Sequence, residues 1–121
     1  MQEYSNEEID FLALQIGCIV RLERLRQKIS QENLGLLIGS NNTAIGRLER
    51  YEHFTSWKIL LKICQSLKIE YSSIFNLQSL DNILSIIDES YNLEEKLTVE
   101  KQLFYKKLKV EAKEKFRKIQ R

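Results

Sequence analysis

Side chains that could recognise the bases of double-stranded DNA cluster between residues 41 and 50. Asn42 suits adenine because an amide can donate and accept on one base edge, Arg47 suits guanine, and the methyl group of Thr43 can contact thymine. Arg50 follows at the end of the segment, where a phosphate contact is the simpler expectation. Asn41 and Asn42 could instead serve only as helix caps, and for Asn41 we favour that structural interpretation.

Two short helices joined by a tight turn are predicted to position these side chains. Ser30 can cap the first helix, and Gly39 can end it because glycine adopts the left-handed conformation without a steric penalty. Asn41 can cap the second helix, which would run from Asn42 to Arg50. The predicted core faces consist of Leu34, Leu37 and Ile38 in the first helix and Ala44, Ile45 and Leu48 in the second. This pattern indicates a helix-turn-helix, whose second helix enters the major groove of DNA.

The rest of the chain is also predicted to be helical, because its 121 residues include no proline and only 4 glycines. Ser5 and Glu8 form a capping-box pattern that opens a helix reaching about Gln27. Ser56 can cap a further helix, and a short helix is expected near residues 71–75. The inward face of the helix after Ser56 is predicted to contain Trp57, Leu60, Leu61, Ile63, Cys64 and Leu67.

The first helix carries more apolar side chains than one core-facing stripe requires. Beside a stripe of Ile9, Leu12, Ile16, Val20 and Leu25, the segment contains Phe11, Ile19 and Leu22. We expect this extra face to pack against the C-terminal helices or against a second subunit.

Two helices are predicted within residues 77–121. The first spans about Ser79 to Ser90. Asn92, followed by Glu95, resembles a new cap, and the helix that it opens could reach Ile119. Its apolar stripe would comprise Leu93, Leu97, Phe104, Leu108, Ala112, Phe116 and Ile119. The period is nearer ~3.6 than ~3.5, so a helical hairpin or cross-subunit packing fits better than a long coiled coil. The basic end is either a solvated face or an extra phosphate-binding surface formed by Lys106, Lys107, Lys109, Lys113, Lys115, Arg117, Lys118 and Arg121.

Composition and charge argue against several other classes of protein. The net charge of +2 is too small to indicate nucleic-acid binding by itself, and no apolar run approaches the ~18 residues of a membrane span. The acidic start lacks the basic and apolar regions of a signal peptide, and Cys18 and Cys64 form no zinc or disulfide pattern, which suits a cytoplasmic protein. With His53 as the only histidine and no phosphate-binding glycine loop, we expect no enzyme activity, cofactor or metal.

Several motifs occur in register along residues 15–76. They are Ile16-Gly17 with Val20 and Arg24, Ser30-Gln31-Glu32-Asn33-Leu34, Gly39 with Ile45 and Glu49, and Leu60-Leu61-Lys62-Ile63 with Leu67 and Ile74-Phe75. This set resembles the Xre family of helix-turn-helix regulators, to which the lambdoid phage repressor and Cro proteins belong. The resemblance implies an all-α chain with a five-helix lambda repressor-like domain in residues 15–76. Residues 1–14 would extend its first helix, and residues 77–121 would form a C-terminal region of two helices for dimerisation or partner binding.

The resemblance implies a transcriptional regulator, most simply a repressor, that binds double-stranded DNA as a homodimer through its C-terminal helices. The positions that contact DNA in the family are occupied here by Gln31, Asn42, Thr43 and Arg47. The family also pairs an arginine of its first helix with the glutamate that closes the recognition helix, which here implies a structural pair of Arg24 and Glu49. The alternative is an antitoxin-like or phage-type interaction module whose C-terminal helices bind a partner protein, with DNA binding secondary.

The chain departs from the family pattern around the recognition helix. Tyr51 stands where the family often has glycine, Thr55 stands where it often has proline, and the loop between them offers only His53 as a basic group. Gly46 lies inside the helix at a cost of about 1 kcal/mol relative to alanine. Either the unit binds DNA modestly and needs a dimer partner or the basic tail, or Gly46 permits a close backbone approach.

Overall fold

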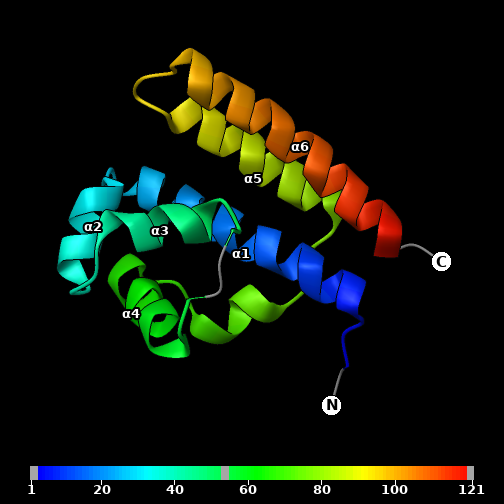
Figure 1. Ribbon diagram of the computed structural model, residues 1–121, viewed down its shortest axis with the longest axis horizontal. Coiled ribbons are helices and arrows are strands. Elements are labelled where there is room, and N and C mark those ends of the chain that lie inside the picture. Colours follow the sequence, from blue (N-terminus) through cyan, green and yellow to red (C-terminus); the bar gives the residue numbers. More distant parts are fainter. Residues whose placement is uncertain (1–2, 53–54, 120–121) are drawn as a thin grey trace.

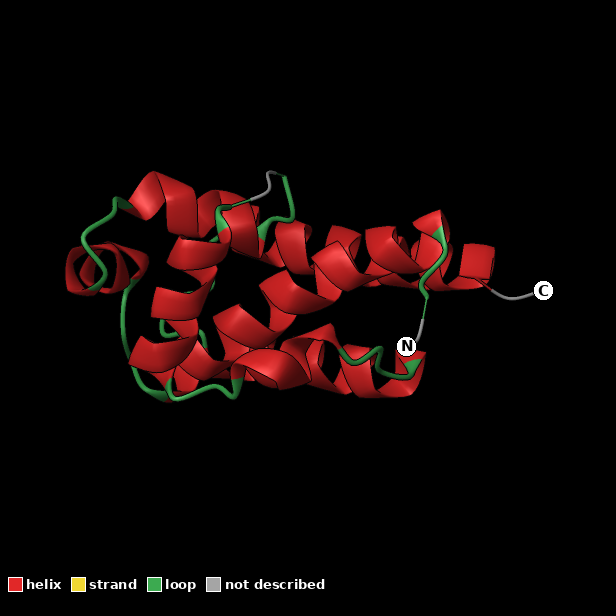
Figure 2. Cartoon of the chain, turned by 90° about the horizontal axis from the view of Figure 1, so that it is seen from below, coloured by secondary structure: helices red, strands yellow, loops and turns green. Residues whose placement is uncertain are grey.

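The computed structural model describes residues 3–52 and 55–119, and all the regular secondary structure in these ranges is helical (Figures 1 and 2). The elements are α1 (Asn6–Arg26), α2 (Gln31–Leu37), α3 (Asn42–Glu49), α4 (Trp57–Leu67), the short 3₁₀ helix η1 (Tyr71–Phe75), α5 (Leu80–Leu93) and α6 (Val99–Ile119). The all-α prediction is therefore confirmed for the described residues. His53 lies outside them.

The predicted helix starts rest on side-chain caps that the structure contains. Each cap is a serine or asparagine oxygen that accepts from the backbone N–H three residues later, and the caps are Ser5, Ser30, Asn41, Ser56 and Ser79. The Glu8 carboxylate also accepts from the backbone N–H of Ser5 at 2.8 Å, which completes the predicted capping box. Gly39 follows α2 with a φ of 70°, as expected for the glycine that ends this helix.

Helix α1 lies between two groups of helices (Figure 1). On one side, its residues Leu12, Ile16 and Val20 share a core with α2, α3, α4 and η1. On the other side, Phe11 and Cys18 pack against buried side chains of α5 and α6, which are Ile83, Ile87, Tyr105, Leu108 and Ala112. Of the extra apolar side chains of the first helix, Phe11 is thus covered by the C-terminal helices of the same chain, whereas Ile19 packs against the other core.

The C-terminal helices form an antiparallel hairpin, with both chain termini at the same end of the molecule (Figures 1 and 2). The predicted boundary between them is wrong, because α5 continues to Leu93 and α6 begins only at Val99. The backbone N–H of Lys101 donates to the Thr98 hydroxyl, so Thr98 opens α6 where Asn92 was expected to do so. Glu94 has an extended backbone conformation instead of a helical one. Its carboxylate accepts a hydrogen bond from the Tyr105 hydroxyl of α6 at 2.5 Å. Leu93 and Leu97 consequently lie outside the buried stripe of α6.

Ile9, Leu37 and Trp57 were predicted to face inward and are exposed instead. Ile9 is 42% exposed, because it lies near the start of α1, before Leu12 and Ile16 enter the core. Leu37 is 64% exposed, because the short helix α2 reaches the core only along the line of Leu34 and Ile38, one turn apart. Trp57 is 63% exposed, because it is the first residue of α4 and projects beyond the core that Leu60 and Ile63 enter.

Gln15, which was not predicted to have a structural role, fixes the connection between η1 and α5. Its side chain is fully buried, and its Nε2 donates to the carbonyl oxygens of Ile74 at 3.1 Å and Asn76 at 2.7 Å. Its Oε1 accepts from the backbone N–H of Gln78 at 2.9 Å. A buried amide with all three of these partners holds the segment after η1 against α1, and so sets where α5 begins.

Both cysteine thiols are free and buried, as predicted for Cys64. Burial raises the pKa of the Cys18 thiol to about 11. We expect iodoacetamide at about pH 8 to label neither thiol in the native chain and both in urea, since the thiolate is the nucleophile. Because the folded pKa of Cys18 exceeds its unfolded value of 9.0, the thiol's contribution to stability should be complete below pH 9.0 and decline as the pH rises towards about 11. Rapid labelling of the native chain would contradict this burial.

Among the helices that the structure describes, none combines the length and apolar character needed to cross a membrane.

Candidate nucleic-acid interface

Helix α3 buries one face and exposes the side chains proposed to read bases. Ile45 and Leu48 lie in the core, whereas Asn42, Thr43 and Arg47 are exposed. Among the described residues, no hydrogen bond or ion pair engages the side chains of these three exposed residues. The structure thus brings them together on a solvent-facing surface where they are available to a ligand.

The other predicted contact residues are already engaged within the chain. Asn41 Oδ1 accepts from the backbone N–H of Ala44 at 2.9 Å, which agrees with the favoured capping role. Arg50 Nε lies 2.7 Å from Glu52 Oε2 in an exposed ion pair. Gln31 Nε2 donates to Glu49 Oε1 at 3.0 Å. A phosphate contact by Arg50 would therefore compete with its exposed ion pair, and one by Gln31 with its bond to Glu49.

A buried ion cluster attaches the C-terminal end of α3 to α1. Arg24 binds the Glu49 carboxylate with two parallel hydrogen bonds, Nε to Oε2 at 2.6 Å and Nη2 to Oε1 at 3.0 Å. Both side chains are buried. Burial disfavours the charge of Arg24, but the hydrogen bond and charge of Glu49 outweigh it and raise the guanidinium pKa. The pair implied by the family resemblance is present and has the bidentate geometry that fixes orientation as well as distance.

Arg21 is a second cation in this cluster. Its part in the cluster was not predicted from the sequence. Its Nε lies 3.5 Å from Glu49 Oε1, and its guanidinium also donates to the Glu49 backbone carbonyl. The same guanidinium carbon lies 4.7 Å from the ring centroid of Phe104 in α6. The spacing of Arg21 and Arg24 could have indicated that Arg21 lies on the same face as Arg24, since residues three apart share a helix face. The cluster therefore links α1, α3 and the C-terminal hairpin.

Two glycines permit the close packing that places α3. A Cβ on Gly17 would lie 2.7 Å from the carbonyl oxygen of Leu48, so α1 and the end of α3 meet backbone to backbone. A Cβ on Gly35 would lie 2.9 Å from the carbonyl carbon of Asn41, which fixes the turn between α2 and α3. Gly46 is different, because a Cβ there would meet only the ends of the Arg50 and Gln31 side chains, at 3.0 and 3.5 Å. Within the described part of the chain, Gly46 therefore permits no close backbone approach.

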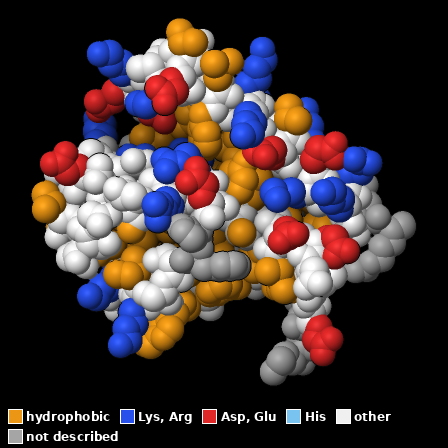
Figure 3. Space-filling view, viewed as in Figure 1, with side chains coloured by type: hydrophobic (Ala, Val, Ile, Leu, Met, Phe, Trp, Pro, Cys, Tyr) orange, Lys and Arg blue, Asp and Glu red, His pale blue; other side chains and the backbone are white. Residues whose placement is uncertain are grey.

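Helix α6 lies beside the C-terminal end of α3. Lys115 Nζ lies 5.9 Å from the ring centroid of Tyr51, two residues after the end of α3. A polar groove of about 600 Å³, lined by Gln31, Arg50 and Lys101 among others, separates the start of α6 from the helix-turn-helix. Acidic and basic side chains are interspersed over the face seen in Figure 3. The molecule thus presents no broad field of one sign there, and any anion binding must rely on local contacts.

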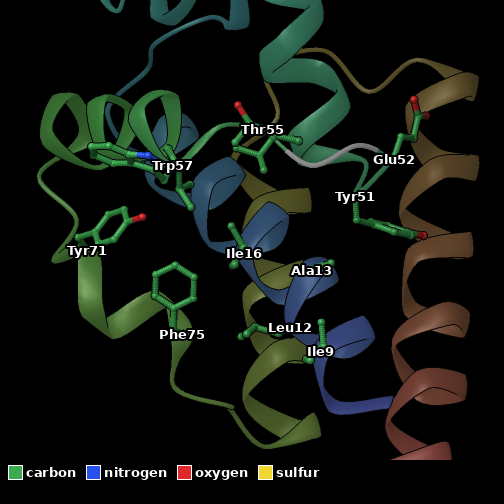
Figure 4. A pocket seen from close by; sticks show the side chains of 12 residues that line it. Ile9, Leu12, Ala13, Ile16, Tyr51, Glu52, Thr55, Trp57, Tyr71 and Phe75 are labelled. Carbon is green, nitrogen blue, oxygen red and sulfur yellow. The ribbon is translucent and has the colours of Figure 1, made fainter. Parts of the chain in front are cut away.

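An apolar groove of about 370 Å³ lies between α1, α4 and η1 (Figure 4). Phe75 and Tyr71 stand opposite the α1 side chains Leu12 and Ile16, and Trp57 forms part of the rim. None of Asn42, Thr43 and Arg47 lines it. The groove is therefore a surface distinct from the exposed face of α3.

Among the described residues, no group of histidine, cysteine, aspartate and glutamate side chains could hold a metal ion. Comparison of the chain with protein-family models, with curated proteins and with solved structures gives no match.

Proposed function

We propose that this chain is a cytoplasmic transcriptional regulator that binds double-stranded DNA through α2 and α3. The observation that carries the proposal is that α3 is fixed to α1 by a buried ion pair while its outer face carries exposed polar side chains. Glu49 anchors α3 to α1 through Arg24, while the side chains of Asn42, Thr43 and Arg47 remain exposed without partners among the described residues. A recognition helix needs both properties, because base readout depends on side chains held at a fixed angle in the major groove.

The proposed fold of residues 15–76 is the five-helix lambda repressor-like domain. The order α1, α2, α3, α4 and η1 around one shared core supports it, as does the tight turn at Gly39 between α2 and α3. In this arrangement Asn42, Thr43 and Arg47 read base edges, Gln31 and Arg50 meet phosphates, and Asn41 caps the helix.

A homodimer that reads two half-sites about one helical turn apart is part of the proposal. The interface between the two subunits could not be the apolar stripe predicted for the last helix, because Leu108 and Ala112 of that stripe are buried within the chain. Light scattering at micromolar concentration tests the dimer separately from DNA binding, and a monomer would leave only single half-site recognition.

Selection from random duplex DNA with the purified full chain tests the proposal. We expect an enriched motif whose binding weakens steeply with added salt, since phosphate contacts release bound cations. The absence of any enriched motif at low salt would overturn sequence-specific binding, and salt-insensitive binding would overturn the phosphate contacts.

A further inference from the structure

The outward face of α6 carries a regular stripe that the described part of the chain leaves uncovered. The inward face buries Tyr105, Leu108 and Ala112. On the opposite face, alternating steps of four and three residues align Val99, Leu103, Lys106, Val110, Lys113 and Arg117, here called the outer stripe. All members of the outer stripe are exposed, including Val99 at 72%, Leu103 at 61% and Val110 at 58%. This alternation is the spacing by which one helix packs along another.

The outer stripe is apolar towards its start and basic towards its end. Among the described residues, no carboxylate lies within ion-pair distance of Lys106 or Lys113. The guanidinium of Arg117 pairs with Glu114, on the same helix. The surface therefore offers apolar side chains to bury and two lysines, Lys106 and Lys113, without an ion-pair partner among the described residues.

A second copy of this helix is a poor occupant of the outer stripe. In a parallel pair in register, Lys106 would face Lys106, Lys113 would face Lys113, and Arg117 would face Arg117, and like charges directly opposed are destabilising. In an antiparallel pair, Leu103 would face Lys113 and Val99 would face Arg117, so each cation would be buried against an apolar side chain. Both arrangements place charges where they find no partner.

We propose that the outer stripe of α6 is the docking surface for an acidic amphipathic helix of a different protein. Such a helix would place apolar side chains against Val99, Leu103 and Val110, and Asp or Glu carboxylates opposite Lys106 and Lys113. The carboxylates would neutralise the cations and discriminate against neutral or basic helices. The proposal does not depend on DNA binding, because Asn42, Thr43 and Arg47 lie on another helix.

The test uses the full chain in its native host, with a photo-crosslinking amino acid in place of Val110. A matched variant carries the same group in place of Ser85, which is exposed on α5. We expect the group at position 110 to crosslink to an amphipathic helical segment of another protein in which Asp and Glu outnumber Lys and Arg. The pair of substitutions Lys106→Glu and Lys113→Glu should reduce this product about tenfold or more. The pair Lys58→Glu and Lys62→Glu, on exposed positions of α4, should leave it unchanged.

Each other outcome overturns the proposal. Crosslinking to a second copy of this chain would assign the stripe to self-association, and crosslinking to a neutral or basic segment would remove the charge argument. Absence of a product specific to position 110, or a product indifferent to Lys106→Glu and Lys113→Glu, would remove the docking surface itself. A last experiment mixes the protein with vesicles rich in phosphatidylglycerol. If the protein sediments with the vesicles and this binding requires Lys106 and Lys113, the outer stripe would be assigned to an anionic membrane instead. Circular dichroism melting confirms that these exposed substitutions leave the fold intact.

Discussion

Replacing Glu49 with alanine is expected to lower the free energy of unfolding by about 3–5 kcal/mol. The carboxylate accepts two hydrogen bonds from Arg24 and lies 3.5 Å from Arg21, and all three side chains are buried. Its removal would leave two buried guanidinium groups without the carboxylate that binds them, and would also remove the acceptor of Gln31 Nε2. Urea unfolding monitored by circular dichroism measures the loss.

The chain contains a matched control for this substitution. Arg26 binds Glu89 with the same paired geometry, Nε to Oε2 at 2.7 Å and Nη2 to Oε1 at 2.8 Å, but this pair is exposed to solvent. Glu89→Ala should therefore cost less than about 1 kcal/mol, as exposed ion pairs generally do. Equal losses for Glu49→Ala and Glu89→Ala would show that burial does not set the strength of the cluster.

Gly17→Ala should destabilise the protein by about 1–3 kcal/mol, although alanine is the better helix former. The added methyl group would lie 2.7 Å from the Leu48 carbonyl oxygen and 3.0 Å from that of Glu49, both of them backbone atoms of α3 that cannot swing aside. Because α3 would have to move away from α1, the affinity for any selected DNA should fall as well. Thermal unfolding and DNA titration of the same preparation measure both effects.

Gly46→Ala is the control for Gly17→Ala, since both substitutions add one methyl group inside a helix. At position 46 the methyl group would meet the flexible end of the Arg50 side chain rather than backbone. We expect stability to be unchanged or raised by up to about 1 kcal/mol, the gain in helix propensity. If Gly46→Ala destabilised the protein as much as Gly17→Ala, the close approach of α1 and α3 would not explain the requirement for glycine at position 17.

The sequence was most informative where structure depends on neighbouring residues. A cap such as Ser30 or Asn41 binds a backbone N–H three residues away, so its pattern is visible in the chain and the structure contains it. The end of α5 was misplaced because Asn92 and Glu95 also fit a capping pattern, whereas the actual boundary depends on Glu94 reaching Tyr105 on the next helix. That contact requires knowledge of the hairpin, which local patterns do not supply.

Long-range partners of polar residues were the least predictable part of the candidate site. The pair of Arg24 and Glu49 was expected only through the resemblance to a known family. Arg21, which lies on the same face of α1, was not predicted to join this pair because its partner Glu49 is 28 residues away in sequence. Gln15 was overlooked for the same reason, since the backbone groups that it binds belong to η1 and to the segment after it. The spacing of Arg21 and Arg24 places both on one helix face, but it does not show which distant residue they bind.

The central claim, direct base readout by the exposed face of α3, is tested most directly by comparing the motifs selected by the wild-type chain and by Arg47→Ala. Arg47 is exposed and free of partners among the described residues, so the variant should melt at the same temperature as the wild type. We expect the variant to lose its preference at one guanine-containing position, a change of about 1–3 kcal/mol, and to keep the rest of the motif. An unchanged motif for Arg47→Ala would contradict direct readout by this helix.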